Sequence, residues 1–275
     1  MKKNISFGRI LIYILLLFGA FMSLLPFAWM LTTSLKTMAE STQIPPTIIP
    51  NKVMWSNYVE VFKLLPFEKY FMNTLISTVI IVVGQLLFCS TAGYAFARLK
   101  FWGKSKIFVV FLTILMVPGQ IYLIPQYLII QKLGLLNSIP ALVLPGLFSA
   151  FGTFLLKQFF EAVPKELEEA AIIDGCNPVQ IYWNVMMPLM KPALITLTIL
   201  TALYGWNSLM WPLIINTSSD KMTLSAGIAS LAGQRTTNVP IMMAGSLIAM
   251  LPMVAFFMAF QKKFIEGIAA TGSKG

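Results

Sequence analysis

The chain has 275 residues, of which 57% are hydrophobic and 11% charged, whereas ordinary soluble domains have roughly 45–50% and 25%. It contains no histidine, so a serine–histidine hydrolase and a histidine-ligated metal site each lack a required group. The formal net charge of +10 does not require a nucleic-acid partner, because basic residues also orient membrane helices and contact lipid headgroups.

Six long stretches carry no charged residue, and each is long enough for the roughly 20 residues that cross a bilayer. Segments such as Ile10 to Phe18 and Leu247 to Phe257 show no alternation of apolar and polar residues, which excludes a transmembrane barrel. We therefore predict a single all-α membrane domain with six transmembrane helices, at about residues 10–33, 71–97, 107–129, 139–157, 192–215 and 241–262.

The first predicted helix could be misread as a signal peptide, because Lys2, Lys3 and Arg9 precede it. Its apolar run is too long, however, and it lacks a small-x-small cleavage site, so we predict that it is retained. The following segment, residues 36–69, contains four prolines and is too long to be a turn. We predict that it lies outside the cell membrane as a cap.

Basic residues predict the orientation of the helices. If both termini are cytoplasmic, thirteen of the twenty basic residues lie inside, and the short loop from Arg98 to Lys106 gives the strongest indication. The inside set is Lys2, Lys3, Arg9, Arg98, Lys100, Lys104, Lys106, Lys157, Lys165, Lys191, Lys262, Lys263 and Lys274. In this orientation the charged loop at residues 158–191, between the fourth and fifth helices, is cytoplasmic.

This loop has the pattern of a helix, a sharp turn and a second helix. Pro164 suits a first helical position, three glutamates follow in the first turns, and Gly175 suits a C-terminal cap, which predicts a helix of roughly three turns. Asn177 then suits an N-cap with Pro178 after it, and the second helix should end or kink near Pro188.

The first helix of the loop has the features of a docking element. Ala170 and Ala171 expose little side chain, so another surface can approach the backbone closely there. Glu169 and its neighbouring glutamates can pair with basic groups on that surface. We predict a knob that fits a partner's groove.

The stretch Glu169-Ala-Ala-Ile-Ile-Asp-Gly175, followed after nine residues by Val185-Met-Met-Pro188, resembles the EAA signature of the membrane subunits of bacterial ABC importers. That pattern is Glu-Ala-Ala, three residues, Gly, nine residues, Ile-x-Leu-Pro, from which Val185 and Met187 depart conservatively. The chain as a whole is similar to carbohydrate-uptake permeases such as the smaller membrane subunit of the maltose importer. Further matching pieces are Ser34-Leu-Lys36, Asn57-Tyr58, Asn73-Thr-Leu75, Tyr94-Ala-Phe-Ala-Arg98, Trp206-Asn207 and Gly267 to Gly275.

The resemblance implies a permease subunit in a bacterial plasma membrane that pairs with a second, homologous permease. Two cytoplasmic ABC ATPase subunits would bind ATP and magnesium, so this chain itself would hold no cofactor, and an extracytoplasmic solute-binding protein would deliver the solute. ATP binding would drive alternating access of the paired bundles. The residues expected to couple the permease to the ATPases are Glu169, Ala170, Ala171, Asp174, Gly175 and Pro188.

No acidic or basic residue interrupts the six predicted spans, in which Lys157 and Lys262 stand only at the last position, and this favours a neutral solute such as a sugar or oligosaccharide. Candidate residues of the solute path are Trp206, Asn207, Tyr204 and Gln120. Amides and aromatic rings also join and fill helical bundles, so a structural role for these residues stays open. Two other functions also stay open: an importer of another small solute, such as an amino acid or osmolyte, and a membrane scaffold that binds a cytoplasmic ATPase without conducting a solute.

Overall fold

A computed structural model describes residues 7–233 and 238–272, and the regular elements within these ranges are all helical. Three helices are long and apolar enough to cross a membrane, namely Ile10–Ser34, Phe67–Arg98 and Val239–Lys262. Three bent pairs also qualify if each pair forms one span, so the described residues offer three to six spans. The count of six stays a prediction. Four of the twenty basic residues counted for the predicted orientation lie outside the described ranges: Lys2, Lys3, Arg235 and Lys274.

The chain divides into two compact units. One unit comprises Met1–Phe67 and Gly227–Leu251, and the other comprises Glu68–Ala226 and Pro252–Gly275. The predicted docking loop and all four predicted path residues therefore belong to the second unit.

The first unit contains the predicted cap segment, which is fastened to the end of the first helix. The Asn57 side chain donates hydrogen bonds to the carbonyls of Ser34 (2.8 Å) and Lys36 (2.9 Å), and the Tyr58 hydroxyl lies 2.8 Å from that of Ser34. Lys36 is buried, where its ammonium donates to the Thr47 carbonyl. The helices of this unit are α1 (Phe7–Ser34), α2 (Met38–Ser41), α3 (Ser56–Leu64), η5 (Leu231–Gly233) and the first part of α15 (Val239–Gly272).

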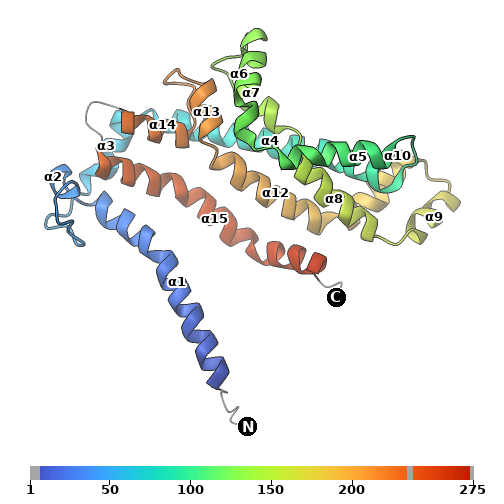
Figure 1. The fold of residues 1–275 in the computed structure, drawn as a ribbon, viewed down its shortest axis with the longest axis horizontal. Helices are drawn as coiled ribbons and strands as arrows, with labels where there is room; N and C mark the ends of the chain where they lie inside the picture. Colours follow the sequence, from blue (N-terminus) through green and yellow to red (C-terminus); the bar gives the residue numbers. More distant parts are fainter. Residues whose placement is uncertain (1–6, 234–237, 273–275) are drawn as a thin grey trace. The chain divides into compact units, whose positions relative to one another are not determined.

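The second unit is a bundle in which α4, α5, α8 and α12 run side by side (Figure 1). Small residues allow these helices to approach closely. A Cβ atom at Gly93 of α4 would lie 3.1 Å from the backbone nitrogen of Lys157, and one at Gly152 would lie 3.1 Å from Cδ1 of Leu197. The elements are α4 (Phe67–Arg98), α5 (Lys104–Leu112), η1 (Thr113–Met116), η2 (Gly119–Tyr122), α6 (Leu123–Lys132), α7 (Ile139–Val143), η3 (Leu144–Gly146), α8 (Ala150–Ala162), α9 (Glu166–Ile173), α10 (Pro178–Gln180), η4 (Ile181–Met186), α11 (Met187–Leu189), α12 (Lys191–Trp206), α13 (Met210–Ile215) and the part of α15 that begins at Pro252. A further helix, α14 (Leu224–Ser230), crosses the boundary between the units.

Three helices that the sequence predicts as continuous are broken in the structure. The predicted helix at 139–157 consists of α7, η3 and α8, with a bend of 45° between η3 and α8. The predicted helix at 107–129 bends by 94° between η1 and η2, where Pro118 lacks an N–H and restricts the residue before it. The predicted helix at 192–215 consists of α12 and α13, with Asn207 as the C-cap of α12.

Candidate functional site

The predicted docking helix is α9, and it is shorter than expected. It begins at Glu166 instead of near Pro164 and ends at Ile173, about two turns instead of roughly three. Lys165 is the N-cap, and its carbonyl accepts hydrogen bonds from the N–H groups of Glu168 and Glu169 (both 3.0 Å). Its acidic residues stand in the first turn, where the helix dipole stabilises negative charge. Glu169 and Ala170 are exposed.

Ala171 is the buried residue of α9. It is only 7% exposed and belongs to a buried cluster with residues of α4, α8, η4 and α12. A small side chain at this position therefore lets α9 rest closely on its own bundle, whereas Ala170 is the alanine of the pair that faces outward. The two alanines of the motif thus lie in different environments.

The turn after α9 has the cap that the glycine predicts. Gly175 has a φ of +82°, a left-handed conformation that glycine adopts without steric cost. The Cys176 N–H donates to the Ala171 carbonyl (2.9 Å) and the Gly175 N–H to that of Ile172 (3.0 Å), which closes the helix end. Asp174 is the exposed C-cap residue.

The second helix of the loop starts as predicted. The Asn177 side chain accepts from the Gln180 N–H (2.9 Å), and the Gln180 side chain accepts from the Asn177 N–H (2.8 Å), with Pro178 at the first helical position. A π-helical turn, η4, follows. Pro188 lies exposed in α11, and the chain then bends by 75° into α12.

Three apolar side chains that the motif did not single out project around this turn. Ile173 is 85% exposed, Val179 is 65% exposed and Ile172 is 61% exposed. We call these three residues together with Glu169, Ala170 and Asp174 the α9 knob. The signal in the sequence was the uninterrupted run Ala170 to Ile173, in which apolar residues occupy more than one side of a short helix.

A cavity of about 640 Å³ lies in the same unit, between α4, the η1 region, η3, α8 and α12. This volume is within the range of small-molecule sites. All of the described residues that line it are uncharged, and its polar members are Gln85, Tyr122, Gln126, Ser149, Thr201 and Tyr204. Gln85 is held in place by hydrogen bonds to the Gly146 carbonyl and from the Thr201 hydroxyl, both 2.8 Å.

The four predicted path residues have different environments, and the structure describes all of them. Tyr204 lines the cavity and is 69% exposed. Trp206 is buried, with its ring 5.6 Å from that of Phe71 in an edge-on arrangement. Asn207 is exposed and donates to the Leu203 carbonyl, and Gln120 is exposed in η2, outside the lining of the cavity.

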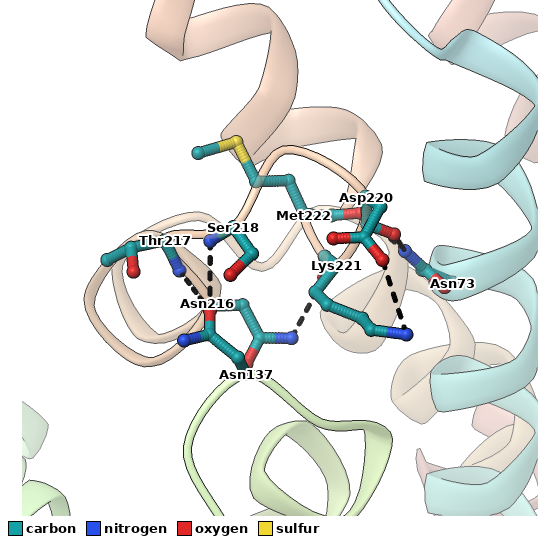
Figure 2. Close-up of polar contacts among 8 residues, drawn as sticks. All are labelled: Asn73, Asn137, Asn216, Thr217, Ser218, Asp220, Lys221 and Met222. Atoms are coloured by element: carbon teal, nitrogen blue, oxygen red, sulfur yellow. Dashed lines mark hydrogen bonds and ion pairs between the residues drawn. The ribbon is translucent and has the colours of Figure 1, made fainter.

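Asparagine side chains hold the loop between α13 and α14, which we call the 216–223 loop (Figure 2). Asn73 of α4 donates to the carbonyls of Asp220 (3.0 Å) and Met222 (2.9 Å). Asn216 donates to the Lys221 carbonyl (2.8 Å). The Asn73 amide therefore fastens the 216–223 loop to α4.

Replacing Asn137 with alanine should release one end of the 216–223 loop. Its side-chain oxygen accepts hydrogen bonds from the N–H groups of Thr217 (2.8 Å) and Ser218 (2.9 Å), and its φ of 55° disfavours alanine. Losing such bonds costs about 1–3 kcal/mol, so amide hydrogen exchange at the two donors should become roughly tenfold faster or more. Asn137→Gly, which keeps the backbone conformation, should accelerate exchange as well. Unchanged exchange in both variants would contradict the role of this side chain.

Comparison with known proteins identifies the family to which this helical bundle belongs. The family described as "Binding-protein-dependent transport system inner membrane component" matches residues 89–269, a range that includes the cavity helices α8 and α12 and the whole α9 knob. The chain belongs to this family. It is therefore a multi-pass membrane component of a transport system and not an enzyme.

Several relatives of this inner membrane component are similar over nearly their whole length. The arabinooligosaccharides transport system permease protein AraQ of Halalkalibacterium halodurans is 35% identical, with 94% of each chain covered. AraQ of Bacillus subtilis is 34% identical, covering 100% of this chain and 99% of that protein. The sn-glycerol-3-phosphate transport system permease protein UgpE of Pectobacterium atrosepticum is 33% identical over 83% of this chain and 84% of its own.

A solved structure has the same fold as this inner membrane component. It is the crystal structure of a bacterial ABC transporter involved in the import of the acidic polysaccharide alginate, one chain of which matches with a TM-score of 0.80 and 25% sequence identity. The match covers 96% of this chain and 99% of the other. The fold of an ABC importer permease is thereby established.

Proposed function

We propose that this chain is the permease subunit of an ATP-driven importer for a neutral sugar or oligosaccharide. The observation that carries the proposal is the cavity of about 640 Å³, whose described lining offers hydroxyl and amide groups among apolar ones and no charge. Such groups suit a solute rich in hydroxyls, which must exchange hydrogen bonds with water for hydrogen bonds with protein. The AraQ relatives, named for arabinooligosaccharides, support this substrate class.

The α9 knob would dock into a groove of a cytoplasmic ATPase subunit. Its exposed isoleucines supply apolar area for the centre of such an interface, and Glu169 and Asp174 supply negative charge at its edge. This requires that the loop at 158–191 and both termini lie in the cytoplasm. ATP and magnesium would bind to two ATPase subunits and not to this chain.

The complete transporter would contain a second, homologous permease and an extracytoplasmic solute-binding protein, embedded in the bacterial plasma membrane. Closure of the ATPase dimer would move the knobs of both permeases, and the paired bundles would change from inward-facing to outward-facing. The cavity, with Tyr204 at its wall, would form part of the solute path. Trp206 would support this wall from its buried position.

The proposal is tested by reconstituting the chain with its co-purifying permease and ATPases in liposomes. A panel of neutral oligosaccharides, each with candidate solute-binding proteins, should include one that stimulates both ATP hydrolysis and uptake. The UgpE relatives favour a second candidate, a phosphorylated polyol, so sn-glycerol 3-phosphate belongs in the same panel. Stimulation by the phosphate ester alone would overturn the neutral-sugar assignment. ATPase binding without stimulation by any solute would favour a non-conducting scaffold.

A further inference from the structure

One face of α4 contacts the docking loop at successive turns. Ser90, Tyr94 and Arg98 are spaced four residues apart, so they lie in a row along the helix. We call these three residues the α4 row. Two of them belong to the Tyr-Ala-Phe-Ala-Arg stretch that ends α4.

The first two residues of the row contact the far arm of the loop. The hydroxyl of Ser90 lies 2.6 Å from that of Tyr182, which belongs to η4 and is buried. The ring of Tyr94 lies 5.2 Å from the ring of Tyr182 and 5.5 Å from that of Phe160 at the end of α8. Aromatic pairs at these separations contribute about 0.5–1.5 kcal/mol each beyond the area that they bury.

Arg98, the last residue of the row, reaches α9 itself. Its guanidinium donates to the carbonyl of Val163, the C-cap of α8, and its Nε lies 3.5 Å from a carboxylate oxygen of Glu168 in α9. The side chains of Arg98 and Glu168 are only 5% and 16% exposed. A charge pair with so little water around it is screened weakly, and removing one partner leaves the other buried and uncompensated.

We propose that the Arg98–Glu168 pair, supported by the α4 row, transmits the movement of the α9 knob to the membrane helix α4. Arg98 is then a positioning residue for transport. The inference rests on the proposed docking of the knob to an ATPase. Its physical basis is that apolar contacts such as that of Ala171 permit sliding, whereas a buried charge pair resists separation, because parting the two groups would leave two uncompensated charges in a poorly hydrated place.

The test replaces Glu168 with glutamine, which has nearly the same shape but no charge. In the reconstituted transporter, Glu168→Gln should keep its ATPase subunits and its basal ATP hydrolysis, while solute uptake per ATP hydrolysed falls at least fivefold, the lower end of typical coupling between sites. The matched control is Glu161→Gln in α8. Glu161 likewise forms an ion pair, with Lys157 at 2.7 Å, but its partner is in the same helix, so uptake per ATP should equal that of the wild type.

Two further variants separate transmission from a merely structural role. Arg98→Gln should resemble Glu168→Gln, and the double variant should be no worse than either single one, because both remove the same contact. Tyr182→Phe keeps the ring and removes only the bond to Ser90, and it should also lower uptake per ATP. It provides the readout if the charge variants do not accumulate in the membrane.

The inference would be overturned if the charge variants took up as much solute per ATP as Glu161→Gln. If only Tyr182→Phe accumulates in the membrane, the same result in that variant would overturn it. Loss of the ATPase subunits from Glu168→Gln would also overturn it, since the pair would then serve docking and not transmission. Failure of the wild-type chain itself to retain ATPases is a different result, because it would refute the proposed docking.

Discussion

Replacing Gly175 with valine is expected to leave the protein in the membrane and to abolish its co-purification with the ATPase subunits. No atom lies within 4 Å of the position that a Cβ would occupy, so the substitution causes no clash. The φ of +82° is the difficulty, because a β-branched residue in the left-handed region costs about 1–3 kcal/mol. The backbone would leave this conformation, and the knob would point elsewhere.

Two variants control for this prediction. Gly175→Asn should retain the ATPases, since asparagine tolerates the left-handed region better than other side chains. Gly134→Val imposes the same kind of strain at another open position, with a φ of +68° at the end of α6, and should retain them as well. Normal co-purification with Gly175→Val would count decisively against the assignment of this turn to docking.

Replacing Ile173 with aspartate should weaken ATPase binding by roughly 30-fold or more, corresponding to about 2 kcal/mol, the scale of an interface hot spot. The side chain is 85% exposed, so the isolated subunit should fold normally. In the assembled transporter, however, a carboxylate would replace apolar contact in a desolvated groove. The affinity of the detergent-solubilised permease for the purified ATPase can be measured by surface plasmon resonance.

Ile44 offers a matched control in the segment between α1 and α3. It is 92% exposed, so Ile44→Asp makes the same chemical change on a surface proposed to face away from the cytoplasm. ATPase affinity should equal that of the wild type. If Ile44→Asp and Ile173→Asp weaken binding equally, the loss reflects charge on the protein and not the α9 knob.

The turn of the docking loop could be read from single residues, because its geometry is decided locally. Gly175 adopts the left-handed conformation that other residues avoid, and Asn177 and Pro178 begin a helix through their own side-chain and ring chemistry. These cues act within a few residues, so they do not depend on the rest of the fold. The apolar stretches similarly indicated the membrane class, although the sequence left the substrate open.

The contacts between distant segments could not be read in the same way. Arg98 looked like a basic residue at a membrane surface, and nothing in its neighbourhood along the chain indicates that it pairs with Glu168, which is 70 positions away. Ala171 looked equivalent to Ala170, yet it faces the bundle, because the direction in which α9 presents each residue depends on how the loop packs. The bend of 94° at Pro118 likewise exceeds what one proline specifies.

The bend at Pro118 lies beside the cavity. Ile114, Leu115 and Val117, at the break between η1 and η2, line the cavity. Peptide groups released from helical hydrogen bonding cannot be satisfied by lipid, and irregular backbone is tolerated at membrane depth where it borders protein or water. We therefore expect a hydrated notch here, with carbonyl oxygens that are held by the chain and cannot rotate away as side chains do. A polyhydroxylated solute entering it would exchange bulk water for oxygens at fixed positions and lose little hydrogen bonding in the passage.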